Sequence, residues 1–221
     1  GRSGYAWLFC TPDLSVFRFR HTRAAGVARE ALGPKRLGGV LVVDRYAGYN
    51  QAPCAIQYCY AHLLRDVQDL EKDFPDQPEV VAFVAAFAPL LAAAMGLRGQ
   101  GLSRRQFRRQ AAALKRRIVA VVNRSASHPA VQQMQDLFRQ KADRLYHWTR
   151  DPAIPAENNL AERELRPLVI ARKVSFGSQS DRGAATRETL MTVLHTLRKR
   201  TADTAAAFKT ALDQLAETPD A

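Results

Sequence analysis

Cysteine is scarce in this chain of 221 residues, which contains only Cys10, Cys54 and Cys59. An odd number of cysteines, with no signal-peptide pattern in the sequence, does not fit a disulfide framework and indicates a reducing cytoplasm. Cys54 and Cys59 lie near His62, but neither the paired C-x-x-C spacing nor a clear fourth ligand is present. We therefore expect free thiols and no structural zinc site.

Acidic residues are also few: the chain has 21 Asp and Glu but 33 Lys and Arg, which gives a formal net charge of +12. Residues 98–124 contain no acidic side chain at all. A field of this sign attracts polyanions such as nucleic acid or an anionic membrane. The alternative is a solvated basic surface, because a run of charge does not by itself identify a partner.

Charged residues are missing altogether from Val80 to Leu97, a run long enough to span a membrane. Its many alanines, the interruption at Pro89 and the weak end at Gly96 favour a buried pair of helices. We expect no membrane partner.

The remaining pattern predicts an α/β protein. Tyr5–Phe9 and Ser15–Phe19 alternate as strands around a turn at residues 11–13, which predicts a hairpin. Gly39–Val43 is a short apolar run typical of a buried central strand, and it ends on Asp44. Further predicted elements are a strand at residues 55–60 and helices at 23–32, 61–74, 184–200 and 204–215. From residue 74 to about residue 150 the pattern is nearly all helical.

Three later features complete this outline. Phe107, Ala111, Leu114, Ile118 and Val121 form one apolar helical stripe flanked by Arg and Lys. Asn158 and Asn159 start a helix as potential N-caps, Pro167 breaks or kinks that helix, and residues 177–183 form a polar loop.

Asp44 at a strand end and Glu162 in the first turn of a helix are the residue types that two-metal phosphoryl transfer requires, because Mg²⁺ prefers hard oxygen ligands. An ordinary loop start is the alternative for Asp44. Sequence spacing alone does not establish that the two carboxylates meet.

Several motifs appear in one order along the chain: Val43–Asn50 (VDRYAGYN), Cys59–Arg65 (CYAHLLR), Asn158–Pro167 (NNLAERELRP), Arg172–Lys173 and Ser180–Gly183 (SDRG). Together they resemble the insertion-sequence-66 family of DDE transposases. Two positions depart from the family pattern, because Arg45 replaces a usual Gly and Tyr60 a usual Trp.

The resemblance implies a ribonuclease-H-like mixed sheet flanked by helices, with three carboxylates holding two Mg²⁺ or Mn²⁺ ions. Asp44 and Glu162 correspond to the second and third carboxylates. The first Asp belongs to a strand that we expect upstream of this sequence, so we expect the chain alone to be inactive. The implied organisation is residues 1–74 as the first part of the core, 75–150 as a helical insertion and 151–221 as the second part of the core.

The resemblance and the local charge also indicate contacts with the DNA backbone. The expected DNA-binding residues are His62, Arg65, Asn158, Asn159, Arg163, Arg166, Arg172, Lys173 and Arg182. Alternatives are that His62 packs against Cys59 and that the two asparagines only cap a helix.

The sequence therefore predicts a DNA transposase catalytic domain that hydrolyses phosphodiesters and transfers strands at transposon ends. The implied partners are double-stranded transposon and target DNA, further copies of the chain in a synaptic complex, and small element-encoded accessory proteins, in the cytoplasm at the nucleoid. A non-catalytic DNA-binding remnant or truncated transposase fragment is the alternative, and a related nuclease on the same fold is a third possibility.

Overall fold

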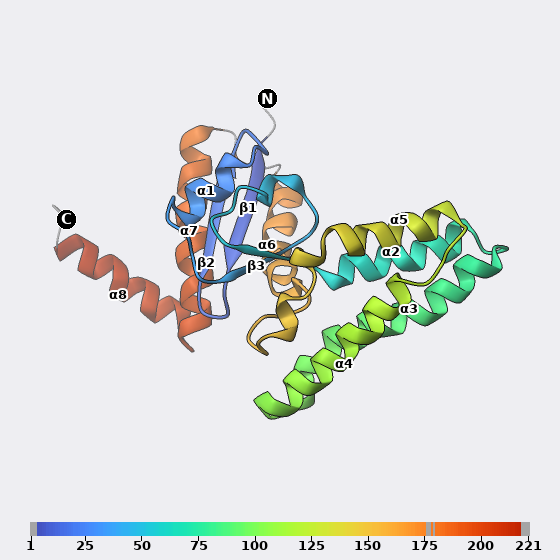
Figure 1. Cartoon of the computed structure of the whole chain (residues 1–221). Coiled ribbons are helices and arrows are strands. Elements are labelled where there is room, and N and C mark those ends of the chain that lie inside the picture. Colours follow the sequence, from blue (N-terminus) through green and yellow to red (C-terminus); the bar gives the residue numbers. More distant parts are fainter. Residues whose placement is uncertain (1–3, 176–177, 179, 218–221) are drawn as a thin grey trace. The chain divides into compact units, whose positions relative to one another are not determined.

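The computed structural model describes residues 4–175, 178 and 180–217 and has a mixed α/β composition. The chain forms two compact units (Figure 1). Unit one comprises Gly1–Gly33 and Asn159–Ala221, and unit two comprises Pro34–Asn158.

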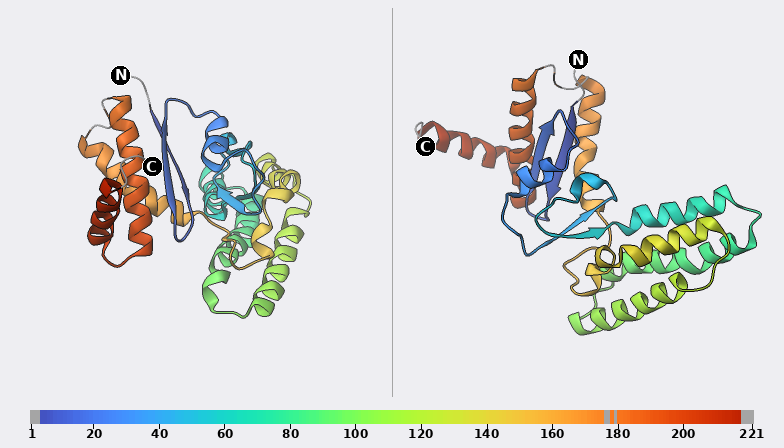
Figure 2. Two further views of the ribbon diagram at one scale, coloured as in Figure 1. Left: turned by 90° about the vertical axis from the view of Figure 1, so that its left-hand side faces the viewer. Right: turned by 45° about the horizontal axis from the view of Figure 1, so that its top comes forward.

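Unit one is built on a hairpin covered by helices. Strands β1 (Tyr5–Cys10) and β2 (Ser15–Arg20) pair antiparallel, which confirms the predicted hairpin. Helix α6 (Asn159–Ser175) packs against β1 and helix α7 (Asp181–Arg200) against β2, so that the hairpin lies between them (Figure 2). Its small apolar core contains Leu8, Phe17 and Leu168. Two shorter helices, α1 (Gly26–Leu32) and α8 (Thr204–Glu217), complete the unit.

Side chains of α7 close the outer edge of β2. Three alternate backbone N–H groups of the strand donate to side chains spaced four residues apart on the helix: Ser15 to Thr196 (3.2 Å), Phe17 to Thr192 (3.0 Å) and Phe19 to Glu188 (2.7 Å). Four helical residues rise about 6 Å and two strand residues about 6.7 Å, so the two spacings match. The helix thereby satisfies a strand edge that would otherwise be open to another chain.

Unit two combines a parallel strand pair with a helical bundle. Strands β3 (Val40–Val43) and β4 (Ala55–Tyr58) pair in parallel. The longer helices are α2 (Tyr60–Asp73), α3 (Pro78–Gly96), α4 (Arg104–Val122) and α5 (Pro129–Gln140). Tyr60, Phe87, Phe138 and Trp148 pack edge to face in its core. All five residues of the predicted α4 stripe are buried, which confirms that prediction.

The predicted pair of helices between residues 80 and 97 is wrong, because α3 is one continuous helix with Pro89 inside it. Proline removes one backbone hydrogen bond. Burial of Phe87, Leu90 and Leu91 on either side of the proline offsets this loss. By length and composition residues 78–100 could cross a membrane, although 44% of the most apolar window is buried inside the protein.

Helix α6 continues through Pro167 to Ser175, so of the two predicted effects of this proline, a break or a kink, the break does not occur. Of the predicted polar loop, Gly177 and Gln179 lie outside the described residues. Ser180 is the N-cap of α7 and accepts the backbone N–H of Gly183 at 3.1 Å, so Asp181, Arg182 and Gly183 are helical and not part of a loop.

Strand β3 is less buried than its apolar sequence predicts. Val43 is buried, whereas Val40, Leu41 and Val42 are only half-buried. Within the part of the chain that the structure describes, β3 pairs with β4 on one side and with no strand on the other. A central strand needs neighbours on both sides, so the expected full burial is not reached here.

Candidate functional site

Asp44 directly follows β3 at the carboxyl end of the parallel strand pair, where α/β proteins commonly form ligand sites. Its Oδ1 accepts the backbone N–H of Tyr46 at 3.1 Å, which fixes the turn after the strand. The neighbouring Val43 carbonyl accepts the backbone N–H of Cys59 at 2.8 Å. The start of α2 is thus attached to the strand end that carries Asp44.

Cys59 links this strand end to the segment that leads into α6. It occupies the N-cap position of α2 and is 1% exposed, and its Sγ accepts the backbone N–H of Asn158 at 3.3 Å. Beside it, the backbone N–H of Tyr60 donates to the carbonyl of Ala156 at 2.8 Å. Two hydrogen bonds therefore join the start of α2 to residues 156–158.

Asn158 occupies the position before α6, where a capping side chain was expected. Its Oδ1 is buried and has no hydrogen-bond partner within the described residues, so the side-chain oxygen does not cap the helix in this structure. A buried amide oxygen without a partner carries a desolvation cost of about 1–3 kcal/mol. The first residue of the sequence motif that contains Glu162 therefore has a side-chain oxygen without a hydrogen-bond partner among the described residues.

The two glutamates of that motif have different surroundings. Glu162 lies in the first turn of α6 and is half-buried. Glu164 accepts a hydrogen bond from Ser15 Oγ (3.0 Å) and contacts His195 Nδ1 (2.9 Å) and Lys199 Nζ (3.8 Å). Burial raises the pKa of Glu164, but the bonds to His195 and Ser15 and the charge of Lys199 outweigh it and leave the pKa below its ordinary value. Glu164 therefore holds α6, β2 and α7 together.

The basic residues predicted to contact DNA are on the surface. Arg163, Arg166, Arg172, Lys173 and Arg182 of unit one are exposed, as is Asn159 at the start of α6. Arg65 is exposed on α2 of unit two, and His62 is half-buried in the first turn of the same helix. Arg45, one of the two departures from the family pattern, forms an ion pair with Asp66.

The predicted site residues divide between the units. Unit two carries Asp44, His62, Arg65 and Asn158. Cys59 bonds to Asn158 and to Val43, the residue before Asp44. Unit one carries Asn159, Glu162 and the five basic residues.

Asp44 and Glu162 offer the carboxylate oxygens that Mg²⁺ requires, so the donor type fits the implied ions. Among the residues described, no group of three His, Cys, Asp or Glu side chains is close enough to hold a metal ion.

The sequence did not predict the contacts that three buried or half-buried residues make. Cys59 stands before a predicted helix, a position where an N-cap could have been expected. Glu164 has partners at positions 15, 195 and 199, and no local pattern indicates such distant pairing. Gln57 is fully buried in β4, where its Oε1 accepts the backbone N–H groups of His147 (2.9 Å) and Trp148 (3.3 Å).

Comparison with known proteins gives one family. The model of a family described as "Transposase IS66 family" matches residues 1–186. The uncharacterized protein y4jD of Sinorhizobium fredii is 26% identical over 211 residues, covering 86% of this chain and 40% of the relative. The uncharacterized protein y4qI of the same organism is 26% identical over 236 residues, covering 92% and 42%. The chain thus spans about two fifths of the length of these relatives. No solved structure matches.

Proposed function

The chain belongs to the IS66 family of transposases, and on that premise we propose that it is the catalytic region of a DNA transposase. Its reaction is metal-dependent hydrolysis of phosphodiesters at transposon ends, followed by strand transfer into target DNA. The observation that carries this proposal is the match over residues 1–186, because the matched region includes both Asp44 and Glu162.

In this proposal Asp44 and Glu162 hold two Mg²⁺ or Mn²⁺ ions together with a third carboxylate, the family's first Asp. When bound, such ions activate the attacking oxygen and neutralise the leaving one. The hydrogen bonds of Cys59 and Tyr60 hold Ala156 and Asn158 at the end of β3 that carries Asp44. This connection favours a role for the Cys59–Arg65 motif in positioning the segment before Glu162.

We propose that a further strand, bearing the first Asp, completes a ribonuclease-H-like sheet. The edges of the two strand pairs support this proposal. The edge of β2 is closed by α7, whereas β1 and β3 each pair with only one strand among the residues described. Residues 75–150 then form a helical insertion between the second and third carboxylates. In this chain α3, α4 and α5 fall within that range.

Exposed cations and amides provide the proposed contacts with DNA. Arg163, Arg166, Arg172, Lys173 and Arg182 are available for phosphate oxygens, and Asn159 is exposed beside them. His62 and Arg65 contribute from α2. The proposal includes a synaptic multimer, accessory proteins and a cytoplasmic, nucleoid-associated location.

Cleavage and strand transfer on labelled element ends test this function. The assay compares the chain, an upstream-extended parent protein, and Asp44→Asn and Glu162→Gln of the parent, each with Mg²⁺ or Mn²⁺. Asp213→Asn is the matched control, because Asp213 is an exposed carboxylate that forms an ion pair with Lys209 on the same helix, α8. We expect the parent and the control to cut and both site variants to be inactive.

A second candidate is a non-catalytic DNA-binding remnant. It is supported by the exposed basic residues around Glu162, which a purely DNA-binding role also requires. A parent protein that binds element ends but never cuts them in either metal would support the remnant and exclude the transposase activity.

A further inference from the structure

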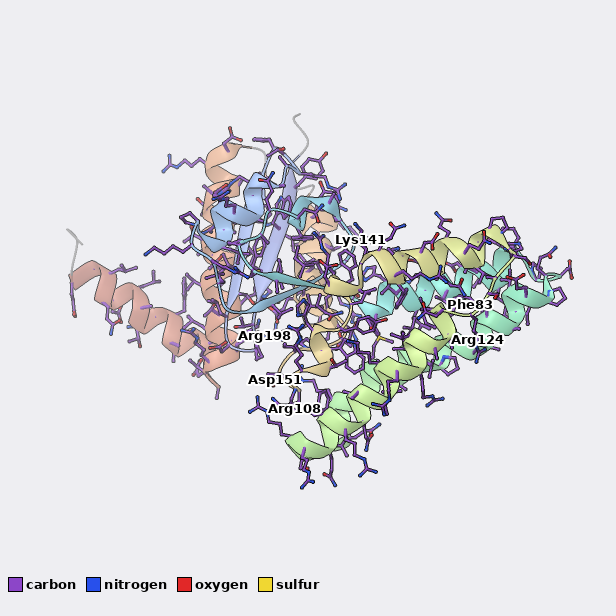
Figure 3. The ribbon with its side chains drawn as sticks, viewed as in Figure 1. Phe83, Arg108, Arg124, Lys141, Asp151 and Arg198 are labelled. Atoms are coloured by element: carbon purple, nitrogen blue, oxygen red, sulfur yellow. The ribbon has the colours of Figure 1, made fainter. Side chains whose placement is uncertain are left out.

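Helix α4 has two lines of basic residues, and the fold uses only one of them. On the first line, Arg104 forms an ion pair with Asp151, Arg108 Nε donates to the carbonyl of Arg150 at 3.2 Å, and Lys115 Nζ lies 4.8 Å from the ring centre of Tyr146. Figure 3 labels Arg108 and Asp151 near the N-terminal end of α4. These contacts attach α4 to residues 146–151 of the same unit.

The second line consists of Arg105, Arg109 and Arg116, all exposed. At 3.6 residues per turn, these three positions lie within about 40° of one another around the helix and opposite the buried stripe. The described part of the chain gives none of them an ion pair or hydrogen bond. Unlike the first line, this line of charge does not stabilise the fold.

The second line also opposes the local stability of the helix. The first turn of α4 has no acidic residue and contains Arg104 and Arg105, where the helix dipole disfavours positive charge by about 0.3–1 kcal/mol. Arg105 and Arg109 form a like-charge pair four residues apart, which costs a further ~0.2–0.5 kcal/mol. A capping box between Ser103 and Gln106 keeps the helix start formed through neutral groups. Charged residues that lower the stability of their own helix, and that make no stabilising contact in the fold, are typical of a binding surface.

We propose that Arg105, Arg109 and Arg116 form a second DNA-binding surface, which contacts the phosphate backbone of duplex DNA independently of its sequence. Eleven residues of helix extend about 16 Å, which corresponds to roughly five base pairs of B-DNA. Guanidinium groups suit this task because they bind phosphate oxygens through two parallel hydrogen bonds. This inference rests on the proposed function, which supplies DNA as the polyanion, and it adds three residues of unit two to the DNA-binding residues proposed there.

The test measures binding of the full chain to a labelled DNA duplex across a series of salt concentrations. We expect Arg105→Gln/Arg109→Gln/Arg116→Gln to weaken binding about 100-fold near 0.15 M salt and to reduce the slope of log K against log salt by about 2.7, since each phosphate contact contributes about 0.9. The matched control replaces three exposed arginines elsewhere: Arg29, Arg36 and Arg198, each to Gln. Because it removes the same formal charge, it accounts for the general field of the protein, and we expect a loss of no more than about threefold.

A second variant guards against a folding artefact. Arg105→Lys/Arg109→Lys/Arg116→Lys keeps the charge, and its duplex affinity should stay within about tenfold of the wild type. If the wild type binds and the Gln variant matches the arginine control, this inference is wrong while the proposed function stands. If the wild type binds no duplex at low salt, both are wrong. Loss of binding to phosphatidylserine vesicles with unchanged DNA affinity would identify an anionic membrane as the partner and overturn the DNA assignment.

Discussion

Replacing Glu164 with Gln should destabilise unit one without touching the proposed chemistry. The carboxylate is 20% exposed and bonds to Ser15 and His195, with Lys199 nearby. Gln keeps the size, and its carbonyl oxygen can take the place of Oε2, which accepts both hydrogen bonds, but the negative charge that strengthens these bonds and attracts Lys199 is lost. Charge-assisted hydrogen bonds contribute about 1.5–3 kcal/mol each, so we expect a loss of roughly 2–3 kcal/mol in the free energy of unfolding at neutral pH.

The pH dependence of this loss is a sharper test than its size. The pKa of folded Glu164 lies below the ordinary value of 4.5, so its stabilising contribution is fully present above about pH 4.5 and disappears as the pH falls through the folded pKa. The variant and the wild type should therefore converge in acid. The difference in stability is measured by urea titration at each pH, and hydrogen exchange of the β2 amides reports on the same unit. Glu217→Gln, at an exposed position on α8, is the control. A variant as stable as the wild type at pH 7, or a deficit that persists at low pH, would refute the reasoning.

Three further substitutions test the contacts that shape each unit. Thr192→Val removes the acceptor of the Phe17 N–H on β2, so exchange of that amide should accelerate, with a loss of about 1–2 kcal/mol; unchanged exchange would show that α7 does not close the edge. Gln57→Leu removes the acceptor of one buried and one half-buried backbone N–H group and should lower the free energy of unfolding of unit two by about 2–4 kcal/mol in urea titrations, whereas a neutral effect would contradict this. Cys59→Ala should cost about 1 kcal/mol and speed exchange of the Asn158 amide, and slow exchange in this variant would argue against the sulfur contact.

Elements with a regular period could be predicted from the sequence. Alternation of apolar residues was enough for the β1–β2 hairpin, and a spacing of three and four was enough for the buried face of α4. The same rules failed at Pro89, because proline costs only one hydrogen bond when the flanking turns are held by packing. Local sequence does not reveal how much packing a helix will gain.

The types of residue in the candidate site could be predicted from the sequence, but only some of their contacts could. Asp44 at a strand end follows from an apolar run that stops at a carboxylate. The different surroundings of Glu162 and Glu164 could not be predicted from the sequence. They depend on Ser15, His195 and Lys199, which contact Glu164 only after the hairpin and α7 have packed. The burial of β3 was overestimated for a related reason, since burial depends on neighbouring strands and not on the apolar run itself.

The most direct test of the central claim asks whether Asp44 and Glu162 touch the catalytic ions. Asp44→Cys and Glu162→Cys of the upstream-extended parent replace a hard oxygen ligand with a thiolate, which Mg²⁺ binds poorly and Mn²⁺ accepts more readily. The measurement is cleavage of labelled element ends by each variant in Mg²⁺ and in Mn²⁺. We predict that both variants are inactive in Mg²⁺ and regain part of their activity in Mn²⁺. Undiminished cleavage in Mg²⁺ by either variant would contradict its assignment as a metal ligand.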